Sequence, residues 1–318
     1  MKNKLVITTL WCIMLNHNIL VSSGQGTLNL VSHCKKGGIS YGVCADNGYA
    51  YITTNKGVVA FDVHNPSKPK KISDISIGVT FGIYLQNDMA YILGGEKLII
   101  ADISDPVNPK ILQDYDFKEY SQCLKVAGDY LYIASETGLE ILDISNPAKI
   151  EPVAHVGDSW YRSVDMCDGI AYVVNYQNGL EVIDVSNPFS PVNITTVPGT
   201  KKSVNIHIHD DYLYLARADS GISILSISNR KSPRVIGNFC DDDNGESKDL
   251  WGNGNYLYVQ DGFGVEVLDV SDPANPYEID EIEGAGGHEI YSDSKLVFIA
   301  TGLKGLIILE FKDNGDII

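Results

Sequence analysis

The chain has 318 residues, 44% of them hydrophobic, so it is long enough to bury a large core without disulfides or metal ions. Its 41 acidic and 24 basic residues give a formal net charge of −17. This balance argues against nucleic acid or an anionic membrane surface as a partner, because no basic patch is available to release counterions.

Residues 1–24 have the features of a secretory signal peptide. MKNK supplies positive charge, LVITTLWCIML is apolar, and VSSG supplies small residues suited to cleavage. No later segment contains 18 uninterrupted apolar residues, so no membrane span is expected in the mature chain. We therefore expect residues 25–318 to form one domain that is secreted or associated with the cell envelope.

Five cysteines follow this segment: Cys34, Cys44, Cys123, Cys167 and Cys240. An odd number in an exported protein predicts at least one free thiol or an intermolecular disulfide. No two cysteines have the CxxC spacing, so nothing favours a zinc ribbon or a thioredoxin-type site.

The rest of the chain is a series of seven units of about 41 residues. The units align on one position at the end of an apolar strand, which is acidic in six units and serine in the fifth. A period this regular indicates an internal structural repeat. The aligned residues are Asp62, Asp102, Asp143, Asp184, Ser226, Asp269 and Glu310.

Each unit predicts a four-stranded antiparallel meander. In the fourth unit the strand GLEVID ends at Asp184, and the β-rich run IAYV, with Tyr172, precedes it. Dipeptides such as NG and DG ahead of the equivalent runs suit a two-residue hairpin turn to the first strand. The fourth strand follows a string that contains proline.

That string, DVSNP in the fourth unit, predicts a turn rather than a catalytic motif. The aspartate carboxylate can accept backbone N–H groups of the next two residues, and Ser with Asx-Pro fixes the turn. The fifth unit departs from the pattern, with Ser226 and then Asn229-Arg230, so we expect a looser turn there.

Seven such sheets fit a closed β-propeller, because closure removes exposed sheet edges. Residues 27–33, TLNLVSH, resemble a fourth strand with no preceding three, whereas the last unit has no fourth strand after Glu310. The N-terminal strand is therefore expected to complete the last sheet. The predicted fold is all-β: a seven-bladed propeller of four-stranded antiparallel blades, closed by the N-terminal strand.

The strings GLEVIDVSNP and GVEVLDVSDPANP, with AYV or LYV upstream, resemble the LVIVD-repeat family of exported and surface β-propellers of bacteria and archaea. The similarity covers essentially all of residues 27–312. The resemblance implies a propeller at or beyond the cell envelope. It implies no catalytic residues, because the family is defined by its scaffold.

Function is expected where the repeats disagree, on the innermost strand of each unit. Two sets of non-repeating residues flank an apolar position there, and alternation along the strand places both opposite the apolar core, on the channel wall. The first set is Gly42, Gly82, Cys123, Ser163, Asn205, Asp249 and Glu289. The second set is Cys44, Tyr84, Lys125, Asp165, His207, Trp251 and Tyr291.

The candidate ligand-binding residues carry aromatic, basic or imidazole groups, which suit a carbohydrate, a peptide or a small anion. The alternative is that each is a satisfied polar group in a wet channel. These candidates are Trp160, Tyr161, Arg162, Lys202, His207, Trp251 and His288.

A divalent metal is a second possibility, with His207, His209, Asp249 and Glu289 as ligands, because imidazole and carboxylate groups suit zinc or manganese. The acidic loop CDDDNGE at 240–246 has the composition of a calcium loop without the EF-hand spacing, and an acidic surface loop is the alternative. No other cofactor is expected.

Three functions stay open. The first is a non-enzymatic binding or scaffold module that presents its channel face to an unknown protein or glycan at the cell surface. The second is a hydrolase or lyase at the channel that uses His207, Asp249, His288 or Glu289, with or without a metal. The third is a purely structural module. Neither a GxSxG elbow nor a P-loop is present.

Overall fold

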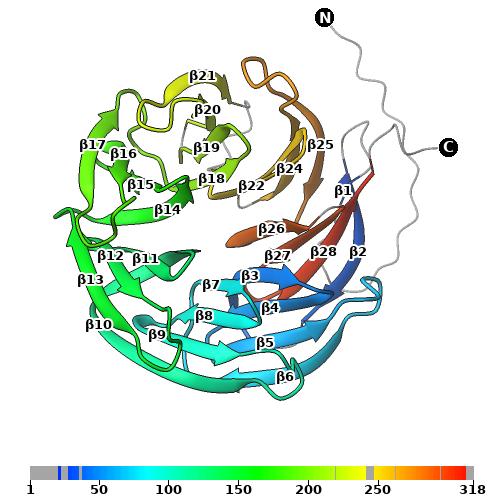
Figure 1. Cartoon of the computed structure of the whole chain (residues 1–318). Helices are drawn as coiled ribbons and strands as arrows, with labels where there is room; N and C mark the ends of the chain where they lie inside the picture. The colour runs from blue at the N-terminus through cyan, green and yellow to red at the C-terminus, as the bar shows by residue number, and fades with distance from the viewer. Residues whose placement is uncertain are drawn as a thin grey trace, which may run out of the picture.

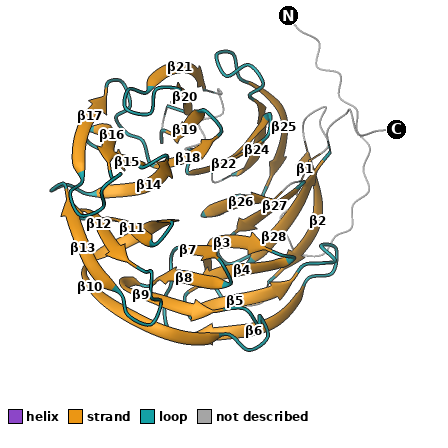
Figure 2. Cartoon of the chain, viewed as in Figure 1, coloured by secondary structure: helices purple, strands orange, loops and turns teal. Residues whose placement is uncertain are grey.

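The computed structural model describes residues 21–22, 28–35, 38–218, 220–240, 247–261, 263–293 and 295–312. Strands joined by turns and loops make up these residues, and none of them is helical (Figure 2). Accordingly, the described part of the chain contains no helix that could cross a membrane. Most of the predicted signal peptide, and residues 241–246 of the acidic loop, lie outside the described residues.

The strands form six antiparallel hydrogen-bonded sheets. Three of them contain four strands that are consecutive in the chain. The first has β3 (Ser40–Asp46), β4 (Tyr49–Thr54), β5 (Gly57–Asp62) and β6 (Lys70–Ser76). The second has β14 (Tyr161–Cys167), β15 (Ile170–Asn175), β16 (Gly179–Asp184) and β17 (Val192–Val197). The third has β18 (Asn205–His209), β19 (Tyr212–Ala216), β20 (Ile222–Ser226) and β21 (Arg234–Phe239).

A seven-stranded sheet joins the second and third repeat units. Its central strand β10 (Lys110–Ala127) pairs with β9 mainly through residues 110–116 and with β11 through residues 121–127. One continuous strand thus ends one unit and begins the next, so the structure has six sheets for seven sequence units. The other strands are β7 (Ile83–Gln86), β8 (Met89–Leu93), β9 (Gly95–Asp102), β11 (Tyr130–Ser135), β12 (Gly138–Asp143) and β13 (Glu151–Val156).

The two remaining sheets include segments from the N-terminal part of the chain. In the last sheet β2 (Leu28–Cys34) pairs with β28 (Leu306–Phe311), from Leu28 opposite Phe311 to Cys34 opposite Leu306, as predicted. That sheet also contains β26 (Glu289–Asp293) and β27 (Leu296–Ala300). The other has β22 (Asp249–Asn253), β23 (Tyr256–Gln260), β24 (Gly264–Asp269), β25 (Tyr277–Glu283) and the short β1 (Val21–Ser22), which pairs with β25.

The sheets are arranged around a common centre, with the first strand of each unit innermost (Figure 1). Neighbouring innermost strands contact one another in the order β3, β7, β10, β14, β18, β22 and β26, and β26 contacts β3. The core lies between the sheets, where the recurrent aromatic residue of each unit is buried: Tyr51, Tyr91, Tyr132, Tyr172, Tyr214, Tyr258 and Phe298. The fold is thus an all-β, propeller-like ring.

The recurrent DVSNP string forms the predicted turn. Oδ1 of Asp184 accepts the backbone N–H of Ser186 at 3.0 Å and its hydroxyl at 2.6 Å, and Oδ1 of Asn187 accepts the N–H of Phe189 at 3.3 Å. The carboxylate therefore binds the second residue after it, rather than the next two. The hydrogen bond from the Lys231 ammonium, together with those from Ser186, lowers the pKa of Asp184 to about 2.

The same string is tied to the first hairpin turn of its own unit. The N–H of Val185 donates to the carbonyl of Gly169 at 2.9 Å, so both turns lie at one end of the meander. The six other units make the equivalent bond, from Val63 to Gly48, Ile103 to Asp88, Ile144 to Asp129, Ile227 to Asp211, Val270 to Asn255 and Phe311 to Lys295. We call this end of the ring the turn face, and it carries the repeated aspartates.

The turn of the fifth unit is looser at its first residue, as expected, because the Ser226 hydroxyl accepts the N–H of Ser228 at 3.4 Å instead of the 3.0 Å at Asp184. The second half of the turn is kept. Oδ1 of Asn229 accepts the N–H of Lys231 at 3.3 Å, as in the other units. Arg230, which replaces proline, bridges two hairpin turns, with Nε 2.9 Å from Asp168 and Nη1 2.9 Å from Asp211. Ion pairs therefore compensate for the missing proline.

We call the opposite end of the ring the mouth face. It holds the connections between units and the second hairpin turn of each unit. Large apolar or aromatic side chains are exposed there: Val79, Trp160, Tyr176, Phe263 and Leu303. The alternation of turns in a four-stranded meander thus places the repeated aspartates at the opposite end of the ring from these side chains.

Candidate functional site

A cavity of about 820 Å³ lies at the centre of the ring. All seven innermost strands contribute to its wall, so residues far apart in the sequence meet there. The volume lies within the range of small-molecule sites. Three layers of side chains surround the cavity, and the two predicted sets account for two of them.

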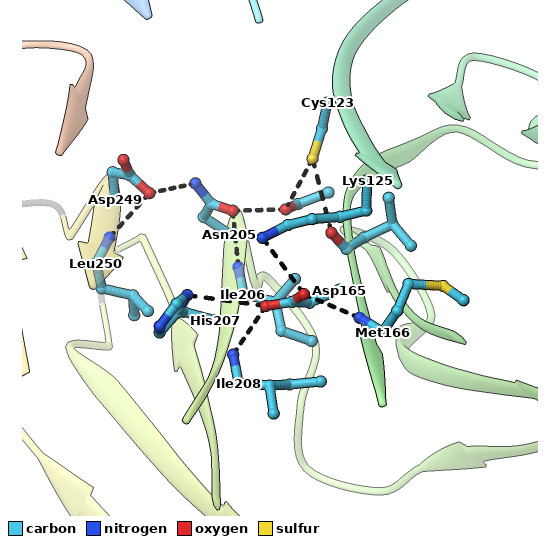
Figure 3. Close-up of polar contacts among 12 residues, drawn as sticks. Cys123, Lys125, Asp165, Met166, Asn205, Ile206, His207, Ile208, Asp249 and Leu250 are labelled. Atoms are coloured by element: carbon cyan, nitrogen blue, oxygen red, sulfur yellow. Dashed lines mark hydrogen bonds and ion pairs between the residues drawn. The ribbon is translucent and has the colours of Figure 1, made fainter. Parts of the chain in front are cut away.

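The first predicted set forms a belt of hydrogen bonds between neighbouring strands. The Ser163 hydroxyl donates to Oδ1 of Asn205 at 2.5 Å, and the Asn205 amide donates to Oδ1 of Asp249 at 2.5 Å (Figure 3). Oδ2 of Asp249 accepts the backbone N–H of Ile290 on β26 at 2.7 Å. The polar groups of this layer therefore hold the inner strands together.

Glu289 continues the belt to the first sheet. Its Oε2 accepts the backbone N–H of Val43 on β3 at 3.2 Å. Burial raises the pKa of Asp249 to about 7, and burial together with the Asp249 charge raises the pKa of Glu289 well above its usual value. Glu289 keeps some exposure to the cavity although it lies deep in the molecule. The two acids therefore cannot both be fully charged at neutral pH.

The second predicted set is organised around an ion pair. Nζ of Lys125 lies 3.3 Å from Oδ1 of Asp165, and the Asp165 carboxylate also accepts the N–H groups of Met166 at 2.9 Å and Ile208 at 2.8 Å (Figure 3). Burial alone would lower the pKa of Lys125, but Asp165, Cys123 and Tyr84 together outweigh it and raise that pKa. Lys125 is therefore a permanent cation inside the ring.

Aromatic rings continue this layer. The rings of His207 and Trp251 lie 4.2 Å apart and are inclined by 31°, and the Trp251 and Tyr291 rings lie 4.5 Å apart. Nζ of Lys125 is 5.6 Å from the Trp251 ring centre and 5.8 Å from that of Tyr84, within the range of cation–π attraction. Lys125 thus lies near one aromatic ring of its own sheet, Tyr84, and one of the sheet that contains β22, Trp251.

His207 is neutral at physiological pH. Burial lowers its pKa to about 3, although Asp165, whose Oδ2 lies 3.8 Å from Nδ1 of His207, opposes the shift. A neutral, stacked imidazole suits a structural or hydrogen-bonding role better than proton transfer near pH 7.

The third layer, which we call the mouth, consists of Tyr41, Phe81, Arg162, Tyr176, Lys248 and His288. The Tyr41 ring lies 5.4 Å from Phe81 and 5.6 Å from His288. The Arg162 guanidinium lies 5.1 Å from the Tyr176 ring centre and 5.2 Å from that of Trp160. The mouth therefore combines aromatic surfaces with positive charge.

Four of the predicted ligand-binding residues line the cavity: Arg162, His207, Trp251 and His288. Three do not. Trp160 is 50% exposed and supports Arg162 from outside the cavity. Tyr161 is buried in the core, where its hydroxyl donates to Glu181 at 2.6 Å. Lys202 lies in a turn with φ of 66°.

The candidate metal ligands do not gather. His209 is outside the cavity wall, and its Nε2 accepts the N–H of Gly254 at 2.9 Å. Asp249 and Glu289 each bind backbone N–H groups. Among the residues that the structure describes, no three His, Cys, Asp or Glu side chains are placed to hold a metal ion.

Four of the mouth residues were not predicted from the sequence: Tyr41, Phe81, Tyr176 and Lys248. Three of the innermost strands begin with a register shift, and Arg162 is the extra residue of the one between Tyr161 and Ser163. Such bulges re-aim side chains, so strict alternation assigns the wrong face there. The available signal was variation two positions before the apolar residue, which gives Tyr41, Phe81, Arg162, Lys248 and His288 in five units.

Comparison with known proteins identifies the repeat. The family model of the LVIVD repeat matches residues 37–75, 77–116, 120–156, 162–197, 201–241 and 244–282. No curated protein matches the chain.

Solved structures share the fold at low sequence identity. The β-propeller domain of Myceliophteria thermophila Cps50 (Swd1) has a TM-score of 0.71 and 13% identity, covering 90% of this chain and 100% of that one. Virginiamycin B lyase from Staphylococcus aureus has a TM-score of 0.67 and 13% identity, covering 92% and 99%. The computationally designed Ika8 protein has a TM-score of 0.63 and 8% identity, covering 89% and 100%.

Proposed function

The chain belongs to the LVIVD-repeat family, and from that premise we propose that it is a binding module of the cell envelope, built as a seven-bladed propeller closed by β2. The division of β10 between two units supports the blade count, and the β2–β28 pairing supports the closure. Residues 1–24 would direct export. Edman sequencing of protein secreted by the native host would test this, because a mature chain that still begins at Met1 would contradict cleavage.

The observation that carries the binding function is that the inner layers of the cavity wall join the strands, whereas the mouth layer does not. The acids Asp165, Asp249 and Glu289 bind backbone N–H groups of neighbouring strands, which is a structural task. The mouth residues, in contrast, surround the entrance to a cavity of about 820 Å³ on the mouth face. A ligand that enters at the mouth therefore meets side chains that the scaffold does not require.

Tryptophan fluorescence offers a direct test. The chain has three tryptophans, and Trp11 lies in the predicted signal peptide, so Trp160 and Trp251 alone would report on the mature protein. Envelope glycans and peptides should shift this emission, and Tyr176→Ala should weaken the binding at least tenfold. Tyr277→Ala, an exposed tyrosine on the outer strand β25, is the matched control. If Tyr176→Ala and Tyr277→Ala both bind as tightly as the wild type, the ligand does not bind at the mouth.

A hydrolase or lyase is the second candidate, favoured by one observation. Asp249 and Glu289 are coupled acids with raised pKa values beside the cavity, and such values suit general acid catalysis. Reducing-end release would detect a hydrolase acting on envelope polysaccharides, and ultraviolet absorbance of an unsaturated product would detect a lyase. Activity that Glu289→Gln abolishes would favour the enzyme, whereas tight binding without turnover would favour the module.

A further inference from the structure

We propose that the mouth binds an acidic glycan, with its carboxylate held by Arg162 and Lys248 and its sugar rings packed on the aromatic side chains of the mouth. This inference rests on the proposed binding function and names its ligand class. Four features of the mouth support it.

The first feature is the position of Arg162. As the extra residue of a bulge, it is turned onto the cavity wall, and its guanidinium lies about 5 Å from the ring centres of Trp160 and Tyr176. Stacking restricts a guanidinium and leaves its edge N–H groups in plane. A carboxylate is the group that matches this fork with two hydrogen bonds.

The second feature is the unpaired charge. In the part of the chain that the structure describes, no carboxylate lies within ion-pair distance of Arg162 or Lys248. Lys125, Arg230 and Lys231, in contrast, have described carboxylate partners. Two cations at a cavity entrance, with no counter-ion among the described residues, therefore favour an anionic ligand.

The third feature is His288, which also belongs to the mouth. Burial and the neighbouring Lys248 charge lower its pKa, so its imidazole is neutral near pH 7. A neutral imidazole can both donate and accept a hydrogen bond. This property suits the hydroxyl groups that flank a sugar carboxylate.

The fourth feature separates a glycan from a peptide. A peptide that adds to a sheet needs free backbone groups, but carboxylates of neighbouring strands already bind the N–H groups of Val43, Ile208 and Ile290 on the inner strands. Recognition at the mouth must therefore use side chains. Tyr41, Phe81 and the exposed ring of Tyr176 offer flat apolar surfaces on which the C–H faces of sugars pack.

The experiment compares trigalacturonate with its fully methyl-esterified form, which has the same sugar backbone but no negative charge, by calorimetry on the mature protein. Triguluronate and a hyaluronan tetrasaccharide extend the panel. At least one acidic glycan should bind tenfold or more tightly than its ester, and Arg162→Gln and Lys248→Gln should each lose about tenfold on the acid and little on the ester. Lys149→Gln on the turn face is the matched control and should change neither affinity.

Thermal melting checks that each variant is folded, and Arg162→Lys, which keeps the charge but not the fork, should retain only part of the affinity. Equal affinity for acid and ester overturns the proposal, and so does tighter binding of a glutamate hexapeptide than of every acidic glycan. If no acidic glycan binds but another ligand does, in a manner sensitive to Tyr176→Ala, the inference fails and the binding function stands. If nothing binds at the mouth, both fail.

Discussion

Lys125 on β10 and Asp165 on β14 form an ion pair between two neighbouring innermost strands, with Nζ 3.3 Å from Oδ1. Their side chains are only 18% and 10% exposed, so the charges are poorly screened by solvent. The Asp165 carboxylate also binds the N–H of Ile208 on β18. One buried carboxylate therefore connects three successive units of the ring.

Replacing Lys125 by methionine should lower the free energy of unfolding by about 3 kcal/mol, because it leaves Asp165 charged and without its cation in a buried site. Urea unfolding would measure the change. Asp165→Asn added to Lys125→Met should recover part of the loss, since it removes the orphaned charge. A loss below about 0.5 kcal/mol for Lys125→Met would show that the pair contributes little to stability.

The Asp249–Glu289 pair predicts a specific pH dependence. Because burial raises the folded pKa of Asp249 to about 7, the folded state holds a proton that the unfolded state has lost above about pH 4. The free energy of unfolding therefore falls as pH rises from about 4 to 7. Glu289→Gln removes one of the coupled acids, so this fall should shrink by about 1 to 2 kcal/mol.

Urea unfolding of both proteins across this pH range would measure the difference. The exposed Glu283→Gln variant is a control for the loss of one negative charge, and its pH profile should follow the wild type. A Glu289→Gln profile parallel to the wild type would show that the two acids do not share a proton.

Arg230 predicts a salt-dependent contribution from the fifth unit. Arg230→Ala removes its ion pairs with Asp168 and Asp211 and should lower the free energy of unfolding by about 0.5 to 1 kcal/mol, because the partners are well exposed. The loss should shrink at high salt, which screens surface charges. Lys149→Ala, which removes a single exposed pair with Glu151, should cost less. Equal losses at low and high salt would point to packing instead.

The five thiols should differ in reactivity. No disulfide joins them in the described part of the chain; burial raises the pKa of Cys44 to about 12 and also raises that of Cys123, whereas Cys240 is exposed. Because the thiolate is the reactive form, an aromatic disulfide reagent at pH 8 should modify Cys240 first and Cys44 only on unfolding. Cys240→Ser should remove the fast phase. A fast phase that persists in this variant would contradict the assignment.

Local, repeated chemistry made much of the fold predictable. The turn string, the hairpin dipeptides and the unpaired N-terminal strand each specify a local structure, and repetition confirmed them against one another. Asn47, Asn87 and Asp168 adopt the positive φ that the hairpin turns demand. The continuous strand β10 was not predictable in this way, because residues 117–120 contain no glycine or proline that would mark a boundary.

The candidate site was less predictable because its contacts are long-range. Asp249 and Glu289 were recognised as wall residues, but no sequence pattern shows that each binds a backbone N–H of the next sheet. Tyr161 and Arg162 are adjacent in the sequence, yet the bulge at Arg162 leaves the Tyr161 side chain in the core and the Arg162 side chain on the cavity wall. The expectation that side chains alternate between the two faces of a strand fails at the mouth, because bulges make the backbone irregular there.

The pairing of β2 with β28 also determines how the ring would respond to mechanical load. Leu28, at the start of β2, lies opposite Phe311, at the end of β28. The segment before β2 and the segment after β28 therefore both leave the strand pair at the same end. Tension between the two ends of the chain would therefore act across the strands, on one hydrogen-bonded pair at a time, because inter-strand bonds run perpendicular to the strands. The β2–β28 pair would therefore open one hydrogen-bonded pair at a time and yield at low force.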